Sequence, residues 1–167
     1  MIEIVEVTSR QQFGAFFQFP FDLYRNCLQW VPPITKEEID IFDPQKNAVF
    51  EHAMARLFLA KKKGKVVGRI AAMINWVEIE ELKKTKVRFG WYDTIDDLEV
   101  SQKLIEAVEG VAIAEGMTYI EGPMGFSNMD KAGLLVHGYE HMNTMITWYH
   151  YPYQKVHLER LGLKKQS

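Results

Sequence analysis

The sequence has little cysteine and no long apolar run. Its single cysteine, Cys27, has no partner for an internal disulfide, so we expect a reducing compartment, the cytoplasm, and a small buried apolar role for this side chain. No apolar stretch approaches the about 20 residues that a membrane-spanning helix requires, and no basic segment followed by an apolar one opens the sequence. We therefore expect no membrane partner.

An excess of charge of one sign is also missing. The formal net charge is -2 and the sequence pI is about 6.2, so the chain has no overall attraction to nucleic acid. Two lysine-rich stretches, 61–65 and 83–86, lack interleaved aromatic residues, and we interpret them as solvated turns with no nucleic-acid partner. What the sequence does contain, 47% hydrophobic and 25% charged residues, is typical of a single globular domain, residues 1–167, with a proper core.

We base the fold prediction on the stretch from Lys86 to Met124. A β-rich run over 87–92 and a second over 118–121 flank an amphipathic helix over 98–115, in which apolar residues recur every three or four positions. We predict that Asp96 caps this helix, with Glu99 at the capping-box spacing, and that Gly116 ends it. A helix that joins two strands at this spacing predicts parallel strands with the helix across one face of the sheet.

Helices and strands are predicted on both sides of this unit. A hairpin with its turn at Lys63-Gly64 precedes it. Before the hairpin, the capping pair Ser9 and Gln12 opens a helix that we expect Pro20 to end. The other expected elements are a strand at 2–7, a helix at 22–29, extended chain at 30–33, a helix at 35–42 capped by Thr35 with Glu38, a loop at 44–52, hairpin strands at 56–60 and 66–76, a helix leading to Leu135, and a strand at 142–148. This order predicts an α/β (α+β) fold with a mixed β-sheet flanked by helices.

With these elements in this order, the chain resembles the GNAT superfamily of N-acyltransferases. More narrowly, it resembles the N-terminal part of a group of uncharacterised bacterial GNAT-like proteins, whose members typically continue with further sheet. The resemblance covers nearly the whole chain and rests on Leu57-Phe58-Leu59-Ala60, Lys65-Val66-Val67-Gly68-Arg69-Ile70, Leu158-Glu159-Arg160-Leu161-Gly162-Leu163, Phe19-Pro20, Leu23-Tyr24-Arg25, Trp30-Val31-Pro32-Pro33, Asp43-Pro44, Phe50-Glu51-His52, Gly122-Pro123-Met124 and Gly133-Leu134-Leu135. The resemblance implies that the chain is either an N-terminal portion or a short version of such a protein, a single GNAT-like domain without its C-terminal strand. If another chain supplies that strand, the exposed sheet edge predicts a homodimer.

The resemblance implies a function and a set of site residues. It implies transfer of an acyl group from acyl-CoA, a co-substrate and not a covalently bound cofactor, to the amine of a small-molecule substrate. The backbone of Gly90, Trp91 and Tyr92 would then pair with the acyl donor, because the splayed fourth strand falls there. Glu121 or Tyr149 would transfer a proton.

Two departures from the GNAT pattern argue against this activity. The turn that binds the CoA pyrophosphate in GNAT enzymes is rich in glycine, which lets backbone N–H groups approach the phosphates. Here the turn, 92–98, has no glycine and no basic residue but carries Asp93, Asp96 and Asp97. Leu158 also stands where many GNAT enzymes have a proton-donating tyrosine. Two hypotheses stay open: an N-acyltransferase-like enzyme, and a non-catalytic binding or dimerisation module.

Other polar and aromatic residues are weaker site candidates. Ser127 and Asn128 follow a predicted parallel strand, where ligands bind in open α/β folds, and they either bind substrate or cap a following helix. The aromatic residues over 148–153 line either a pocket, a partner surface or the core. The segment 137–141 matches the H-x-x-E-H pattern of zinc peptidases, but that pattern needs an unbroken helix and Gly138 interrupts it, so we predict no metal site.

Overall fold

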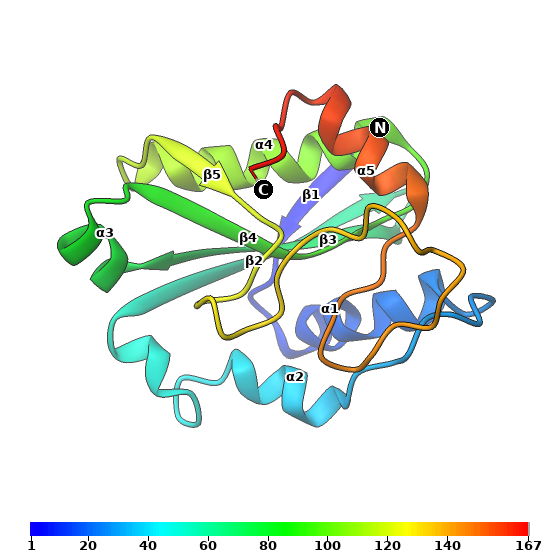
Figure 1. Ribbon diagram of the computed structural model, residues 1–167, viewed down its shortest axis with the longest axis horizontal. Helices are drawn as coiled ribbons and strands as arrows, with labels where there is room; N and C mark the ends of the chain where they lie inside the picture. The colour runs from blue at the N-terminus through cyan, green and yellow to red at the C-terminus, as the bar shows by residue number, and fades with distance from the viewer. Residues whose placement is uncertain (167) are drawn as a thin grey trace.

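The computed structural model describes residues 1–166, which form a five-stranded sheet with helices on both faces (Figure 1). Strands follow each other in the sheet in chain order, β1-β2-β3-β4-β5. The elements are β1 (Ile2–Glu6), α1 (Arg10–Leu23), α2 (Thr35–Ile41), a 3₁₀ turn η1 (Ala48–Glu51), β2 (Ala53–Lys62), β3 (Lys65–Asn75), α3 (Trp76–Leu82), β4 (Lys86–Thr94), α4 (Leu98–Ala114), β5 (Tyr119–Glu121) and α5 (Pro152–Arg160). The predicted α+β class is confirmed.

The sheet is mixed, as the crossover spacing predicted. The first four strands pair antiparallel, whereas β4 and β5 are parallel, with Lys86 opposite Tyr119. The predicted hairpin is present: Lys62 lies opposite Lys65, and Lys63 and Gly64 both have positive φ, as a tight two-residue turn requires.

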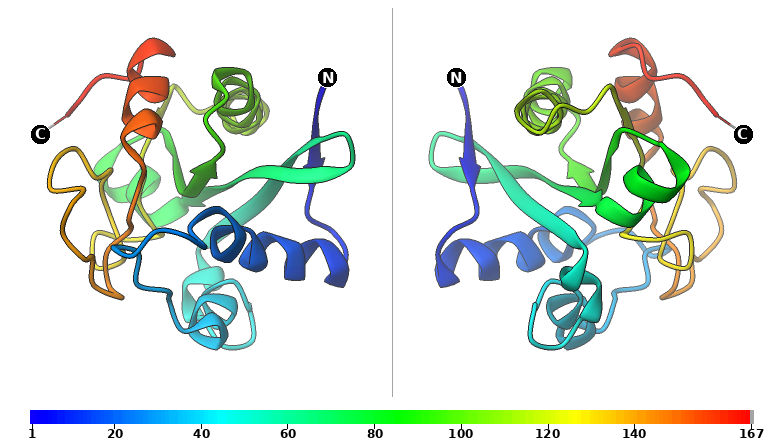
Figure 2. Two further views of the ribbon diagram at one scale, coloured as in Figure 1. Left: turned by 90° about the vertical axis from the view of Figure 1, so that its right-hand side faces the viewer. Right: turned by 90° about the vertical axis from the view of Figure 1, so that its left-hand side faces the viewer.

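Helices lie on both sides of the sheet (Figure 2), and an apolar layer packs on each of its two faces. Along β2, Phe58 packs with the α4 side of the core and Leu59 with the α1 side, since successive strand side chains point to opposite faces. Helix α4 approaches closely enough that a Cβ on Gly68 would lie 2.9 Å from side-chain atoms of Val100 and Leu104. The α1 side is rich in aromatic residues, and the site described below lies there.

Helix α4 has the predicted bounds, but a different residue caps it. Asp97 is the N-cap and accepts from the Glu99 N–H. Asp96 instead lies 3.1 Å from His157 of α5. Gly116 has the left-handed conformation expected just after the helix, with φ of +69°.

The prediction that Pro20 ends the first helix is wrong. Helix α1 continues through Pro20 to Leu23, and the predicted separate helix at 22–29 does not form. A proline inside a helix leaves the carbonyl four residues earlier without its donor. Here the Arg69 guanidinium supplies a substitute, because its Nη1 donates to the Phe16 carbonyl at 3.0 Å.

Several other local predictions also need correction. Thr35 is the first helical residue of α2, and Glu38 is buried in the site instead of closing a capping box. The segment after β3, for which no helix was predicted, forms the short helix α3. Residues 122–151, all described, contain neither the helix expected before Leu135 nor the strand expected at 142–148. Within residues 1–166 no helix has the length and apolar character needed to cross a membrane.

Candidate functional site

Strand β4 carries a β-bulge at the position that the resemblance assigned to the acyl donor. The pairs Arg69 with Asp93 and Ala71 with Gly90 leave two residues of β4, Trp91 and Tyr92, opposite one residue of β3. Trp91 has φ of +49°, which is rare for a bulky side chain. Bulges of this kind redirect side chains and occur next to functional sites.

Beyond the bulge, β4 separates from its parallel neighbour. The last residue pair between β4 and β5 is Arg88 with Glu121, and the chain after β5 makes one more contact when the Met124 N–H donates to the Phe89 carbonyl. A Cβ on Gly90 would collide with the Met124 carbonyl and would lie 2.9 Å from Trp148 Cη2. Only glycine fits at this position of the bulge.

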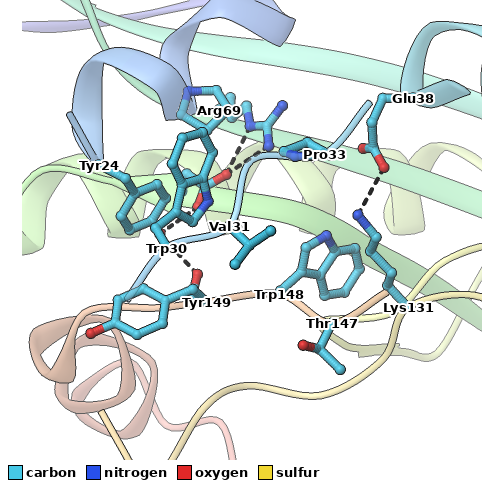
Figure 3. A pocket seen from close by; sticks show the side chains of 12 residues that line it. Tyr24, Trp30, Val31, Pro33, Glu38, Arg69, Lys131, Thr147, Trp148 and Tyr149 are labelled. Atoms are coloured by element: carbon cyan, nitrogen blue, oxygen red, sulfur yellow. Dashed lines mark hydrogen bonds and ion pairs between the residues drawn. The ribbon is translucent and has the colours of Figure 1, made fainter. Parts of the chain in front are cut away.

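A small pocket lies against the bulged strand on the α1 side of the sheet (Figure 3). The loop after α1, with Trp30, Val31 and Pro33, forms one wall, and residues 147–149 form the opposite wall. Arg69 and Asp93 of the two central strands complete it. Its free volume is about 20 Å³, enough for a group the size of one water molecule.

A buried ion pair at the pocket connects the sheet to α1. Arg69 and Asp93 are both almost fully buried and approach to 2.8 Å. The Tyr24 hydroxyl, at the end of α1, donates to the other Asp93 oxygen at 2.7 Å. Burial, and then the negative charge of Asp93, raise the pKa of Tyr24 well above its ordinary value, so this phenol stays protonated at neutral pH.

A second buried carboxylate also borders the pocket. One oxygen of Glu38 accepts from the Trp91 indole N–H at 2.6 Å, and the other accepts from Lys131 at 2.9 Å. Lys131 belongs to the irregular chain that follows β5. The pocket therefore holds two carboxylates and two cations, and its net charge is close to zero.

One polar atom of the pocket has no partner. Among residues 1–166, the indole nitrogen of Trp148 is the buried side-chain donor or acceptor without a hydrogen bond. The ring packs edge-on against Trp91, with 5.5 Å between centroids. In Figure 3 its nitrogen edge faces the space between Pro33 and Lys131. An indole N–H can only donate, so it needs an acceptor from water or from a ligand.

Helix α5 occupies the edge of β4 that β5 leaves open. The Tyr153 hydroxyl donates to the Thr94 carbonyl at 2.6 Å, and Gln154 donates to the Tyr92 carbonyl at 3.3 Å. Burial raises the pKa of Tyr153, which keeps its hydroxyl a donor. An acyl donor that pairs with this part of β4 has to displace these side chains.

The acidic turn between β4 and α4 has fewer free carboxylates than its sequence implied. Asp93 points into the pocket and pairs with Arg69, so it does not belong to the mouth of the turn. Asp97 caps α4 and forms an ion pair with Lys62 at 2.8 Å, whereas Asp96 contacts His157. The turn between β4 and α4 therefore presents two carboxylates, Asp96 and Asp97, and each of them already contacts a basic side chain.

Two predicted site residues belong to a separate charged cluster. Glu121 pairs with Lys86, and Asn128 accepts from Arg88 at 3.1 Å. Burial alone would raise the pKa of Glu121, but the hydrogen bond from Lys86 and the charges of Lys86 and Arg88 leave it below its ordinary value. Glu121 therefore stays ionised and holds the sheet edge together through ion pairs, away from the residues that line the pocket.

Ser127 does not cap a helix, because residues 128–151 contain none. Its hydroxyl accepts from the Met129 N–H at 3.2 Å, and its own N–H donates to Asp130 at 2.8 Å, which closes a local turn. Neither Ser127 nor Asn128 lines the pocket.

Tyr149 does line the pocket, but its hydroxyl points out of it (Figure 3). This hydroxyl donates to the Tyr139 carbonyl at 2.9 Å, and burial raises the pKa of Tyr149 to about 12. The backbone carbonyl of Tyr149 instead faces inward and lies 3.0 Å from the Tyr24 hydroxyl. Of the predicted proton-transfer pair, Tyr149 borders the pocket and Glu121 does not.

The histidine pair of the H-x-x-E-H segment lies in irregular chain. Gly138 has φ of +78°, and the segment has no helix that would place both histidines on one face. His141 lies 3.2 Å from Glu140, with both side chains exposed. Within residues 1–166 no three His, Cys, Asp or Glu side chains group in a way that could hold a metal ion.

Sequence reasoning missed Arg69, Tyr24, Glu38 and Lys131 as pocket residues. Arg69 gave one usable signal, a charge inside an otherwise apolar strand. Glu38 was assigned to a helix cap, and Lys131 comes from a segment without periodicity.

Two curated relatives match the chain, while a search of protein-family models finds no match. Protein YghO of Escherichia coli K12 is 31% identical over 157 residues, which are 94% of this chain and 40% of that protein. Bacterial ceramide synthase of Caulobacter vibrioides is 31% identical over 140 residues, 83% of this chain and 36% of that protein. The chain thus spans well under half the length of both relatives.

Solved structures match at low sequence identity. A tandem GNAT protein from the clavulanic acid biosynthesis pathway superimposes with a TM-score of 0.56 at 12% identity, over 72% of this chain and 35% of that one. A predicted acetyltransferase from Clostridium acetobutylicum, solved with acetyl-CoA, gives a TM-score of 0.59 at 10% identity over 100% of this chain and 92% of its own. Together with the mixed sheet and the bulged, splayed β4, these likenesses show that the chain has a GNAT-like fold.

Proposed function

We propose that this chain carries the acyl-transfer site of an N-acyltransferase that uses an acyl-CoA and a long-chain amine. The observation that carries the proposal is the bulged β4 edge beside a pocket with two buried carboxylates. A GNAT-fold neighbour solved with acetyl-CoA supports a CoA thioester as donor. A relative named ceramide synthase supports an amine acceptor, since ceramide is the amide of a fatty acid with a long-chain amino alcohol.

An exposed apolar rim supports a long-chain substrate. It consists of side chains on two loops beside the pocket, Leu28, Ile34, Met142, Met145 and Ile146, which are between 44% and 84% exposed. The two loops are joined, because the Asn143 N–H donates to the Gln29 carbonyl at 2.9 Å and its side chain accepts from the Val31 N–H. Of these side chains, Met142 also lines a depression of about 520 Å³, which other residues between Leu135 and Tyr149 complete. Exposed apolar side chains beside a depression commonly mark a binding region.

The chemistry requires an amine nucleophile near a carbonyl carbon. The amine nitrogen bonds to the thioester carbon, the carbon–sulfur bond breaks, and the sulfur leaves with its electron pair; the proton lost by the amine converts this thiolate to a thiol. We assign Glu38 to the amine, because a substrate ammonium can replace Lys131 beside it. The ammonium gives one proton to the Glu38 carboxylate, which later releases it to solvent, and so becomes the neutral amine that attacks. Gly90, Trp91 and Tyr92 stay the proposed donor-binding strand, and Tyr149 stays the proposed proton donor, a role for which its hydroxyl has to leave the Tyr139 carbonyl and turn into the pocket.

A second candidate function is a non-catalytic module of GNAT-like fold. The contacts from Tyr153 and Gln154 to the β4 carbonyls favour it, because they fill the edge where a thioester donor would lie. The two candidates differ in whether an acyl-CoA can displace the α5 side chains Tyr153 and Gln154 from the β4 carbonyls.

Thermal unfolding against CoA, octanoyl-CoA and palmitoyl-CoA distinguishes the two candidates. A ligand at a hundred times its dissociation constant stabilises the native state by about 2.7 kcal/mol, which raises the midpoint by about 5–10 °C in a domain of this size. The enzyme hypothesis predicts such a shift with an acyl-CoA and a smaller shift in a Glu38→Gln variant when a long-chain amine is added. No shift with any donor favours the module.

A further inference from the structure

We propose that the indole N–H of Trp148 binds the carbonyl oxygen of the acyl substrate and receives the negative charge that develops on that oxygen during transfer. This inference deepens the proposed acyl transfer and rests on it. Trp148 is then a catalytic residue of the site, supplied by the irregular segment between β5 and α5.

The Trp148 indole nitrogen has no hydrogen-bond partner among the described residues. Buried donors in folded proteins nearly always have an acceptor, and a native exception calls for a water or a ligand. Among the described residues the Trp148 nitrogen is that exception. A different rotamer that exposed the nitrogen would break the packing of the ring against Trp91, so the orientation is held by neighbouring aromatic groups.

The space that the Trp148 nitrogen faces suits a hydrogen-bond acceptor. The pocket has room for one water-sized group, such as a single oxygen atom. Its acceptors are already engaged, since Asp93 accepts from Arg69 and Tyr24, and Glu38 accepts from Trp91 and Lys131. Its remaining capacity is for donation, by Trp148 and by the spare protons of Lys131. The occupant that fits is an acceptor, and a carbonyl oxygen is an acceptor alone.

Trp148 also lies beside the strand proposed to bind the acyl donor. Trp148 lies over Gly90, whose missing side chain makes room for the indole ring. Gly90 begins the β-bulge and belongs to the stretch proposed to bind the acyl donor. The unpartnered donor and the splayed strand therefore meet at one place.

The role of the N–H in the reaction follows from charge. When the amine nitrogen bonds to the carbonyl carbon, the carbonyl π electrons move to the oxygen. When the carbonyl reforms, the carbon–sulfur bond breaks and the thiolate leaves with its electron pair. A fixed donor at that oxygen stabilises the charged intermediate more than the neutral thioester, which accelerates transfer.

The test follows the indole proton directly. The protein labelled with nitrogen-15 has four tryptophans and so four indole signals, and a Trp148→Phe variant identifies the one concerned. The probes are octanoyl-CoA, its thioether S-octyl-CoA, which has the same chain without the carbonyl, and N-octanoylethanolamine, an amide without CoA. We expect the Trp148 proton to move downfield with octanoyl-CoA and with the amide, and not with the thioether.

Affinity gives the second readout. Trp148→Phe is expected to lose at least tenfold in affinity for octanoyl-CoA and none for the thioether. Because phenylalanine is smaller, a second variant replaces Trp148 by benzothienylalanine, which keeps the ring shape and lacks the N–H, and the same loss is expected. Trp76→Phe, at the start of α3 and outside the pocket, is the matched control and should bind all three probes as the wild type does.

Each outcome decides between the two proposals. A downfield shift with the amide but no binding of octanoyl-CoA keeps the carbonyl site and overturns acyl-CoA as the donor. Binding of octanoyl-CoA with an unmoved Trp148 signal, or with equal affinity in both Trp148 variants, overturns the inference while the proposed function stands. No movement of the signal with either carbonyl probe means that the nitrogen binds an ordered water only, and the inference fails.

Discussion

Removing the Arg69 guanidinium should disrupt both the helix α1 and the pocket. In an Arg69→Met variant the buried Asp93 carboxylate loses its cation, and the Phe16 carbonyl, which Pro20 leaves without a donor, loses its hydrogen bond. Breaking a buried pair by removing one partner typically costs about 3–5 kcal/mol. For a chain of this length that lowers the unfolding midpoint by about 6–20 °C. Urea unfolding followed by circular dichroism measures the free energy.

Two further variants separate the two roles of Arg69. Adding Pro20→Ala to Arg69→Met restores a helical N–H to the Phe16 carbonyl, so about 1 kcal/mol should return. Adding Asp93→Asn removes the uncompensated charge, and a larger part of the loss should return. Arg25→Met is the control, because the Arg25–Asp22 pair is exposed, with side-chain exposures of 72% and 50%, and should contribute at most about 1 kcal/mol. A loss below about 1 kcal/mol in Arg69→Met would refute this account of the buried pair.

Three further predictions test the site and the core. Gly90→Ala should lower the free energy of unfolding by about 1–3 kcal/mol or more, because the new Cβ collides with the Met124 carbonyl. Gly110→Ala, in open space on α4, should raise the free energy of unfolding by about 1 kcal/mol. Similar urea midpoints for the two variants would contradict the packing at the bulge. Burial lowers the pKa of His150 from 6.5 to about 4, so the unfolded chain binds a proton at higher pH than the folded chain does. The folded state therefore loses about 3 kcal/mol of stability as pH falls from 6.5 to 4. A His150→Asn variant should show a shallower slope of urea midpoint against pH. Tyr153→Phe should tighten octanoyl-CoA binding, since it frees the Thr94 carbonyl, and unchanged affinity in a calorimetric titration would show that the donor does not lie on this edge.

The sequence predicted elements whose signal is local and periodic. The amphipathic stripe of α4, the Lys63-Gly64 turn and the crossover spacing gave the sheet and its parallel pair correctly. Capping was less predictable, because two acids, Asp96 and Asp97, compete for one helix start, and packing of α5 decides between them by engaging Asp96.

The pocket could not be predicted because long-range contacts build it. Tyr24 lies 69 residues from Asp93 in sequence, and Glu38 lies 93 residues from Lys131. Pro20 is a local signal for a helix end, and it misled the prediction because Arg69, on a strand, supplies the missing hydrogen bond. Residues 122–151 contain no helix or strand, so the spacing of apolar residues cannot indicate their structure. For this reason Trp148 was wrongly predicted to lie on a strand.

Formation of an amide is the most direct test of the proposed acyl transfer. The protein is incubated with palmitoyl-CoA and a long-chain amino alcohol such as sphinganine, and the products are separated and identified by mass spectrometry. The account predicts enzyme-dependent formation of the N-palmitoyl amide together with free CoA, at a rate that falls at least tenfold in Trp148→Phe and stays unchanged in Trp76→Phe. Absence of the amide with the wild-type protein, together with no shift of its unfolding midpoint by palmitoyl-CoA, would contradict the account.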